Sequence, residues 1–366
     1  MTPIQLNRPS WILNSALVLV SRTGRNHNER EKDVAKVDFL YLSREDVKAV
    51  GIGTEEIITL VEGAFRSHGE GKVILPPKTV ISFDGEAGGR FNALPAFMYD
   101  LNVAGVKWAP GFPNNYKKGL PYQMMISILS DGDTGAPLVI MDSYWLTARR
   151  TGAAAAVGAK YLARKESKVL GIIGAGYVSP WVAEAMRMVL PKLELVKITD
   201  VRVEQAEAMA QRVRTEMGLH AVVLTSAEAV ARGSDVIATV TTNFGERFLK
   251  DEWVQPGALV VAVGGPNEIT GELTRKVEKI VVDDTAQCIH RGNIGGLVKE
   301  GIIGEKNIYA EIEDLVIGRK PGRENETERI ICVPIGMGTE DIAVGHRVYQ
   351  LAKEKGIGQT LTLFDE

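Results

Sequence analysis

The sequence predicts an α/β protein in which a doubly wound parallel sheet of the Rossmann type is joined to a second, mixed α+β part. Strand-like and helical runs alternate from residue 168 onward, and such alternation is typical of a parallel sheet with helices on both faces. A glycine-rich turn separates the first of these strands from the helix that follows it. Between residues 79 and 141, short strand-like runs joined by turns indicate an antiparallel sheet instead.

Composition excludes several classes of function. The 366 residues carry a formal net charge of -3, and 45% are hydrophobic, which is typical of a globular chain long enough for two domains. Such a charge creates no field that would attract nucleic acid or an anionic membrane. The two cysteines, Cys288 and Cys332, form no CxxC pattern, and the five histidines form no HExxH or HxH motif. We therefore expect no metal site, no disulfide framework and a cytoplasmic location.

The first 38 residues are expected to be an N-terminal extension. Its apolar run at residues 11–20 is too short to span a bilayer. The run also lacks the basic head and the cleavage site of a signal peptide. We interpret it as a strand docked on a neighbouring element, followed by a polar linker over residues 26–33.

The first part of the chain is expected to hold two helices and an antiparallel sheet. Ser43 precedes an acidic turn, which is a helix-start signal, and Thr54 opens a second helix that ends near Gly69 and Gly71. The predicted strands span residues 79–83, 89–98, 103–109, 123–129 and 137–141, with a turn at 131–135 before the last of them.

A long helix from Tyr144 to near Arg164, rich in small residues at 152–157, leads into the second part. The predicted strands and helices there alternate, with strands at 168–173, 195–199, 235–239, 258–263 and 279–282 and helices at 178–190 and 204–216. An amphipathic helix over residues 339–355 is expected to pack back on the first part of the chain.

The clearest motif is the run Gly174-Ala175-Gly176-Tyr177-Val178-Ser179, which follows a buried-strand run at once and opens a helix. In dinucleotide-binding folds the first glycine permits a tight turn and the second lets the backbone approach a pyrophosphate. The helix N-terminus then offers free N–H groups to that anion. Ser179 stands where a third glycine is usual, so the motif is imperfect.

An acidic residue in the expected place supports the same interpretation. Asp200 ends the next strand, where a carboxylate hydrogen-bonds a ribose 2′-hydroxyl and repels a 2′-phosphate, which favours NAD over NADP. Arg202 lies two positions on and can meet a phosphate, so NADP stays possible. The alternative is an ordinary β–α turn with Asp200 as a helix cap. Because strand, turn, helix and acid coincide, we favour the cofactor site.

Two further loops should lie beside this motif. Residues 239–242 and 263–267 follow predicted strands and are expected at the carboxyl edge of the sheet, where ligands of doubly wound folds bind. The predicted cofactor-binding residues are Thr151, Gly174, Gly176, Tyr177, Val178, Asp200, Arg202, Thr241 and Gly264.

Two basic residues are candidates for the substrate side. Lys107 lies in the apolar run 103–109, and a buried ammonium needs an anionic partner or a functional role. The alternative is a lysine on the solvent face of a half-exposed strand. Arg150 follows Arg149 in a helix, so one of the two can face solvent while the other faces the cleft. A guanidinium suits capture of a carboxylate, although a solvated pair of arginines is the alternative.

The ordered set of motifs resembles the ornithine cyclodeaminase/mu-crystallin family over about residues 39–361. The segments that carry the resemblance are Gly105-Val106-Lys107, Gly119-Leu120-Pro121, residues 131–142, residues 147–153, Gly174-Ala175-Gly176, Ala262-Val263-Gly264 and residues 335–343.

The resemblance implies a homodimer and a division of the chain into two domains. Residues 39–150 with 335–366 would form the substrate-binding and dimerisation domain, and residues 151–334 the Rossmann domain. It also implies that Lys107 and Arg150 bind the substrate carboxylate. Lys78 falls where the family usually has an arginine with the same task, so the charge is kept but the bidentate fork is lost.

Two departures from the family pattern argue against ornithine cyclisation. Cyclodeaminases carry an aspartate after the Val-Gly-Gly loop, where this chain has Pro266, followed by Asn267 and Glu268. Proline has neither a carboxylate nor an N–H. Tyr122 stands where the family often has threonine.

The leading hypothesis is therefore an NAD(P)-dependent oxidoreductase. It would transfer hydride to or from the Cα of a small amino or imino acid, as an imine or ketimine reductase or an amino-acid dehydrogenase. The second hypothesis is an NAD-dependent cyclodeaminase acting on ornithine or a similar diamino acid, with Glu268 or Asn267 replacing the missing aspartate. The third is a non-catalytic, mu-crystallin-like protein that holds NADPH.

Overall fold

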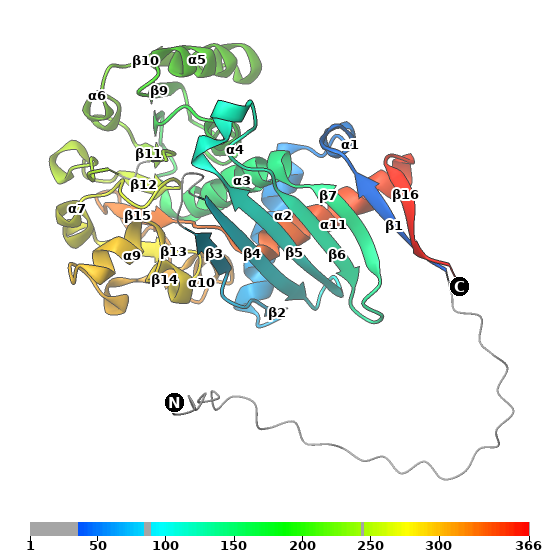
Figure 1. The fold of residues 1–366 in the computed structure, drawn as a ribbon. Coiled ribbons are helices and arrows are strands. Elements are labelled where there is room, and N and C mark those ends of the chain that lie inside the picture. The colour runs from blue at the N-terminus through cyan, green and yellow to red at the C-terminus, as the bar shows by residue number, and fades with distance from the viewer. Residues whose placement is uncertain (1–35, 84–88, 243–244, 366) are drawn as a thin grey trace, which may run out of the picture.

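The computed structural model describes residues 36–83, 89–242 and 245–365. Apart from residues 36–38, the predicted N-terminal extension, with its apolar run and polar linker, lies outside the described residues. Two sheets stand side by side in the described chain, each with helices packed against it (Figure 1). The predicted class, a doubly wound parallel sheet with a second mixed α+β part, is confirmed.

The first sheet is built almost wholly from the N-terminal part of the chain. Its strand order is β16-β1-β7-β6-β5-β4-β2, and β3 also pairs with β4. All its pairs are antiparallel except β1 with β7. The strands are β1 (Val37–Leu42), β2 (Val73–Ile74), β3 (Thr79–Phe83), β4 (Gly89–Met98), β5 (Val103–Gly111), β6 (Ile126–Asp131), β7 (Pro137–Asp142) and β16 (Gln359–Phe364).

Four helices pack behind this sheet, namely α1 (Arg44–Ala49), α2 (Thr54–Gly69), α3 (Tyr144–Leu162) and α11 (Gly338–Lys355). The helix-start signal at Ser43 is confirmed, because its side chain accepts the Asp46 N–H in a capping box. Helix α11 lies against α2, β4 and β5, as predicted for the last helix of the chain.

Strand alternation decides which side chains of the first sheet face these helices. One row across five strands is wholly buried and consists of Leu94, Lys107, Ser127, Met141 and Leu42. Because successive side chains of a strand point to opposite faces, the next row faces away from the helices. Lys107 therefore lies on the inner face, and the alternative of a solvent-facing lysine is wrong.

The second sheet is wholly parallel, in the order β10-β9-β8-β11-β12-β15-β13-β14. Its strands are β8 (Val169–Ile173), β9 (Leu195–Thr199), β10 (His220–Val223), β11 (Val236–Thr239), β12 (Leu259–Ala262), β13 (Lys279–Val282), β14 (Ala310–Glu311) and β15 (Ile330–Val333). The chain order reverses direction between β8 and β11, and ligands of doubly wound folds bind at such a switch point.

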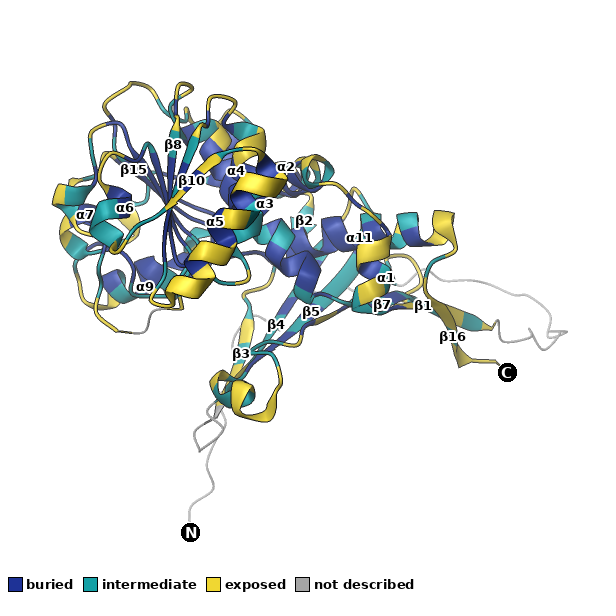
Figure 2. Cartoon of the chain, turned by 90° about the horizontal axis from the view of Figure 1, so that it is seen from above, coloured by how far each residue is buried: buried dark blue, intermediate teal, exposed yellow. Residues whose placement is uncertain are grey.

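Helices cover both faces of the second sheet, as Figure 2 shows by the buried strands between them. Helices α3, α4 (Ser179–Val189) and α5 (Val203–Met217) share one core with it. Helices α6 (Ala227–Ala231), α7 (Gly271–Lys276) and α9 (Gly292–Lys299) share the core on the other face. Two further short helices are α8 (Thr285–Cys288) and α10 (Ile312–Val316). The described residues include no helix long and apolar enough to cross a membrane.

Helix α3 joins the two parts of the structure. It packs against both α2 and α4, and a Cβ added at Gly152 would lie 2.5 Å from the Trp181 carbonyl oxygen. The small residues of α3 therefore let its backbone approach α4 closely. The predicted domain division at residues 150/151 stays a proposal: the two sheets support it, whereas the boundary falls inside one continuous helix.

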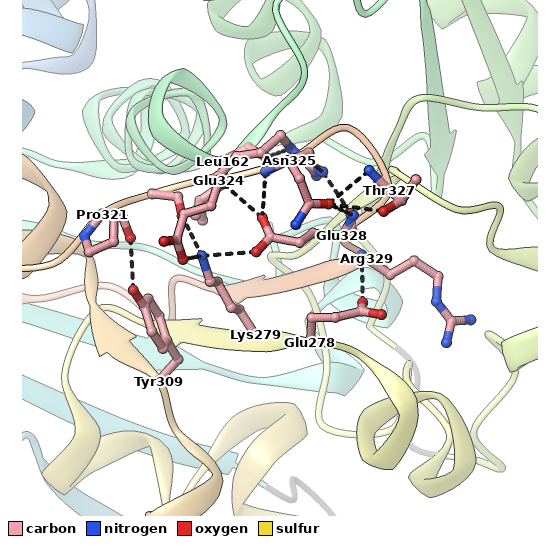
Figure 3. A network of polar contacts seen from close by, with 12 residues as sticks. Leu162, Glu278, Lys279, Tyr309, Pro321, Glu324, Asn325, Thr327, Glu328 and Arg329 are labelled. Carbon is pink, nitrogen blue, oxygen red and sulfur yellow. Dashed lines mark hydrogen bonds and ion pairs between the residues drawn. The ribbon is translucent and has the colours of Figure 1, made fainter.

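A buried lysine fixes the segment that leads into β15. The Lys279 ammonium, at the start of β13, donates to the Gly322 carbonyl and pairs with Glu324 and Glu328 at 2.6 and 3.1 Å (Figure 3). The ammonium also lies 4.7 Å from the centre of the Tyr309 ring. These contacts hold the loop before β15, the strand from which the chain returns to the first sheet.

Candidate functional site

The glycine-rich loop has the geometry that its sequence predicts. Gly174 has a φ of 98°, and a Cβ there would lie 2.6 Å from the Val240 carbonyl oxygen, so only glycine fits. A Cβ at Gly176 would meet no atom within 4 Å, which leaves that side of the backbone open to a ligand. Ser179, in the place of the third glycine, donates its hydroxyl to the Gly174 carbonyl at 2.6 Å. The serine thus tightens the same turn.

Asp200 is tied to this loop. Its carboxylate accepts the Ala175 N–H at 2.7 Å and the Arg202 N–H at 2.8 Å. Arg202 is the N-cap residue of α5, and this helix has no side-chain cap hydrogen bond, so the alternative of Asp200 as a helix cap is wrong. A carboxylate has further lone pairs beyond these two, and its contact with a ribose stays a prediction. The Arg202 side chain is 65% exposed.

Two cavities meet over the glycine-rich loop. The first, of about 570 Å³, extends from Gly174 toward Asp200 and α6. The second, of about 420 Å³, extends toward the first sheet. Both are lined by Gly176, Arg202, Val240, Thr241 and Thr242. All nine predicted cofactor residues line at least one of them. The shape suits an elongated ligand that bends over Gly176, such as a dinucleotide.

The second cavity carries features that fit the nicotinamide half. The Thr147 hydroxyl is buried and has no hydrogen-bond partner among the described residues, although the residue lines the cavity. A buried polar atom without a partner indicates a missing ligand or water. Tyr177 stacks on Tyr144 with ring centres 4.4 Å apart, and both line the same cavity. The residues present therefore fit a dinucleotide.

Glu268 does not replace the missing cyclodeaminase aspartate. Its buried carboxylate accepts the Thr241 N–H at 2.9 Å, the hydroxyls of Thr239 and Thr241 at 2.8 and 2.7 Å, and the Asn293 amide at 3.1 Å. It lines neither cavity. The Asn267 amide donates to the Gly245 carbonyl at 2.8 Å. The suggestion that Glu268 serves the substrate is wrong, because its oxygens hold the loop after β11.

Gly264 lines the second cavity, and close packing also explains why the residue is glycine. A Cβ there would lie 2.3 Å from the Glu268 carboxylate and 2.4 Å from the Thr241 nitrogen. The residue is therefore required for the close packing of two loops, whatever it contacts in a ligand.

The predicted cations of the substrate side lie together in the interior. The Lys107 ammonium is 2.7 Å from one carboxylate oxygen of Asp341, and Arg150 Nε donates to the other at 3.0 Å. Arg150 also donates to Glu340 at 2.7 Å. Lys107 and Arg150 are 3% and 5% exposed. The structure thus brings the two residues to one point, where they share a carboxylate of the chain itself.

Burial shifts the proton affinities of this cluster. Desolvation, helped by the positive charge of Arg150, lowers the pKa of Lys107 to about 8 even though Asp341 opposes the shift. Desolvation also raises the pKa of Glu340 to about 7 against the opposing charge of Arg150. Lys107 therefore loses its proton far more readily than an exposed lysine.

Lys78 completes the group from the segment between β2 and β3. Its ammonium is 3.5 Å from the Ile335 carbonyl oxygen. Burial lowers its pKa, while the nearby charge of Asp283 opposes the shift. Asp283 is fully buried at the end of β13 and accepts the Gly336 N–H at 2.6 Å. Lys78, Lys107 and Arg150 thus face three buried carboxylates, which are those of Asp283, Glu340 and Asp341.

Arg149 differs from the expectation that one arginine of the pair faces solvent. Its guanidinium lies 4.7 and 5.1 Å from the ring centres of Trp145 and Trp181. It also pairs with Glu184 at 3.7 Å, and its side chain is only 11% exposed. Stacking on two indole faces stabilises the cation away from water. Neither arginine of the pair therefore faces solvent: Arg150 belongs to the buried cluster with Lys107, and Arg149 packs against two tryptophans.

Sequence reasoning missed the acidic half of the cluster. Glu340 and Asp341 stand in the first turn of α11, where acidic residues are expected for helix capping alone. Gly336, just before, has a φ of 89°, and a Cβ there would lie 2.5 Å from Arg150 Nη1. The sequence did contain one signal for these acids, because a buried Lys107 requires an anionic partner.

Comparison with known proteins agrees with this architecture. Residues 39–356 match the ornithine cyclodeaminase/mu-crystallin family. The chain belongs to this family. Alanine dehydrogenase of Archaeoglobus fulgidus is 37% identical over 332 residues, which cover 90% of this chain and 99% of that protein.

Solved structures of the same family superpose closely. An archaeal alanine dehydrogenase dimer with bound NAD gives a TM-score of 0.84 at 38% identity, over 89% of this chain and 100% of that one. The Δ1-pyrroline-2-carboxylate reductase of Thermococcus litoralis, in complex with NADH and L-proline, gives 0.83 at 34% identity, over 88% and 99%.

Proposed function

We propose that the protein is an NAD-dependent oxidoreductase that acts on the Cα–N bond of a small amino or imino acid. The observation that carries this is the convergence of Lys78, Lys107 and Arg150 in the interior, next to the residues of α3 that line the second cavity. The three cations themselves line neither cavity. The arrangement supports binding of a carboxylate at one end and of a dinucleotide at the other. Relatives named as alanine dehydrogenase and pyrroline-2-carboxylate reductase support the same reaction class.

The roles follow from the contacts. Arg150, Lys78 and Lys107 hold the substrate carboxylate, and Glu340 and Asp341 keep Arg150 in place. Lys107, with its pKa lowered to about 8, holds a proton that it gives to the imine nitrogen or takes back from the amine. The bound nicotinamide supplies the hydride that Cα accepts. Fixing Cα in this way lowers the barrier through orientation alone.

The test is NADH oxidation with a panel of substrates. The panel consists of 2-oxo acids with ammonia or an amine, and of cyclic ketimine carboxylates. We expect turnover with at least one member and the reverse reaction with the matching amino acid. Absence of turnover throughout the panel, together with formation of proline from ornithine without net NADH production, would sink the proposal.

The pH dependence of the reductive reaction should report Lys107. With a cyclic ketimine carboxylate as substrate, kcat/KM should be level at pH 7 and fall about tenfold per pH unit above about 8, since the acid must be protonated. In the oxidation of the amino acid Lys107 must act as the base and be neutral, so kcat/KM for that direction should rise with pH through about 8. A reductive profile that stays flat to pH 10 would exclude Lys107 as the proton donor.

Asp200 is proposed to set the preference for NAD. In Asp200→Ser the Kd for NADH should rise about tenfold, as expected for loss of a hydrogen bond to a charged group, while the Kd for NADPH falls. Fluorescence titration of both cofactors measures this. Because Asp200 also holds the Ala175 N–H, equal weakening of both cofactors would mean that it acts through the loop only.

No observation on the described residues supports either alternative, the cyclodeaminase or the non-catalytic binding protein. Cyclodeamination needs a carboxylate near the substrate amine in the place of Pro266, and Glu268 is committed to the loop after β11. A binding protein without turnover would be distinguished by the substrate panel itself, since it would bind NADPH and oxidise nothing.

We further propose a homodimer formed through the open face of the first sheet. Helices α2, α3 and α11 lie behind this sheet, and no helix of the described chain covers the face turned to the viewer in Figure 1. One row across that face is apolar apart from one hydroxyl and consists of Pro95, Val106, Ile128, Ile140 and Tyr41. Tyr41 is exposed and the other four are half-buried, and a contiguous apolar face that stays accessible to solvent is typical of a protein interface. The archaeal alanine dehydrogenase is a dimer.

Ile128→Asp should convert the dimer into a monomer, because a charge in the middle of the row would be buried without a partner. Sedimentation velocity measures the mass. Val222→Asp on β10, where the native valine is 41% exposed, is the matched control and should keep the wild-type mass. A wild-type monomer, or a dimeric Ile128→Asp variant, would contradict this interface.

The predicted location in the cytoplasm also remains a proposal. Cys288 and Cys332 are both buried free thiols, which supports a reducing compartment.

A further inference from the structure

We infer that Glu268 is a positioning residue for the cofactor, which holds two loops in the places that the nicotinamide half of a dinucleotide requires. Glu268 is fully buried and lines neither of the two cavities over the glycine-rich loop. It therefore acts on a ligand only through the residues that it holds. The inference rests on the proposed function, because it requires that these cavities bind NAD.

One oxygen of this carboxylate joins the loops that follow β11 and β12. Oε1 accepts the N–H and the hydroxyl of Thr241 at 2.9 and 2.7 Å. The Thr241 carbonyl in turn accepts the Gly265 N–H at 2.7 Å. Gly264 lies at the same point, since a Cβ there would be 2.3 Å from Oε1 and 2.4 Å from the Thr241 nitrogen. The side chain of Glu268 thus sets the position of Thr241 relative to the two glycines.

The other oxygen is anchored to the first turn of α9. Oε2 accepts the Asn293 amide at 3.1 Å and the Thr239 hydroxyl at 2.8 Å. The amide oxygen of Asn293 accepts the backbone N–H groups of Glu268 and Ile269 at 2.8 and 3.3 Å. Because these bonds require an oxygen at that end of the amide, its nitrogen has to donate to the carboxylate. Asn293 therefore holds Glu268 by both its backbone and its side chain.

The loops that Glu268 holds belong mainly to one half of the cofactor site. Gly264 and Gly265 line the second cavity and not the first, while Thr241 lines both. Asp200, at the opposite end, lines the first cavity only. The second cavity has the features that fit the nicotinamide half. Loss of the contacts of Glu268 should therefore weaken binding of that half and leave the adenosine half in place.

Glutamine has the shape of glutamate but cannot make this set of contacts. A group that can only donate faces each oxygen, namely the Thr241 N–H at Oε1 and the Asn293 amide at Oε2. A side-chain amide has one oxygen and one NH2 group, so in either orientation of Glu268→Gln the NH2 group meets a donor. Adding Asn293→Asp removes the conflict, since a carboxylate there accepts that NH2 group and still accepts the two backbone N–H groups.

The experiment measures cofactor affinity of the full-length protein by calorimetry. The ligands are NADH and ADP, which has the adenosine and both phosphates but no nicotinamide. In Glu268→Gln the Kd for NADH should rise about tenfold, the effect of one buried hydrogen bond lost, while the Kd for ADP stays within about twofold. The double variant Glu268→Gln/Asn293→Asp should return the Kd for NADH to within about threefold of the wild type. Glu272→Gln, an exposed residue in the first turn of α7, should equal the wild type.

A milder variant keeps the test open if Glu268→Gln does not fold. Thr239→Val removes one donor to Oε2 and keeps the shape of the side chain, and it should raise the Kd for NADH about threefold without changing that for ADP.

Other outcomes separate the possible failures. An unchanged Kd for NADH in Glu268→Gln, or equal weakening of NADH and ADP, would overturn this inference and leave the proposed function intact. A double variant that binds NADH no better than Glu268→Gln would also overturn it, because the exchange of donor and acceptor would then have no effect. A wild type that binds neither NADH nor NAD would defeat the proposed function itself.

Discussion

Lys107→Met should lower kcat about 1000-fold for the reductive reaction while the Kd for NADH stays within about twofold of the wild type. General acid catalysis by a positioned side chain contributes about 100- to 10,000-fold, and the ammonium is also part of the carboxylate-binding group. Stopped-flow oxidation of NADH gives kcat, and fluorescence titration gives the Kd. The residual Lys107→Met activity should lose the decline above pH 8.

A matched control is available on the surface. Lys192→Met removes an exposed lysine after α4 and should behave as the wild type. If Lys107→Met keeps more than a tenth of the wild-type kcat, the residue is neither the proton donor nor an essential part of the carboxylate site. Circular dichroism of the variant distinguishes a lost function from a lost fold.

Asp341→Asn should lower the free energy of unfolding by about 3–5 kcal/mol, which is the usual cost of removing one partner from a buried ion pair. Lys107 and Arg150 are both bonded to this carboxylate, and after the change they would stand close together with only Glu340 to balance them. Urea denaturation followed by tryptophan fluorescence measures the effect.

A double variant tests whether the lost stability comes from unbalanced positive charge. Adding Lys107→Met to Asp341→Asn removes one of the two unbalanced charges, so it should restore part of the lost stability. Asp133→Asn, on the exposed turn between β6 and β7, should change the stability by less than about 0.5 kcal/mol. Additive losses in the double variant would mean that the ion pair contributes little.

The cofactor-binding half of the site could be predicted from the sequence because its residues lie close together in the chain. Gly174, Gly176 and Asp200 belong to one strand-turn-helix-strand unit, in which each residue predicts the place of the next. The strands β10 and β15 were missed, although β11, β12 and β13 have the same length of four residues and were predicted. A run of that length shows no periodicity, and its place in the sheet depends on pairing with distant strands.

The substrate half was less accessible because its decisive contacts are distant in the chain. The run 103–109 is apolar on both faces, so alternation could not tell whether Lys107 faces the helices or the open face. Pairing with Leu94 and Ser127 decides the matter. Likewise, Asp341 was visible only as an acid near a helix start, and its two cationic partners come from β5 and α3. A buried Lys107 requires a nearby anion, but only the folded structure shows that this anion is Asp341.

The position of α11 in the chain has a consequence for biosynthesis. Lys107 and Arg150 leave the ribosome long before Glu340 and Asp341, which balance their charges. A nascent chain that ends before residue 338 would have to bury two bare cations to complete its first core, at high cost in free energy. The first sheet is therefore expected to stay open during translation, and to close only when the last helix arrives to neutralise it.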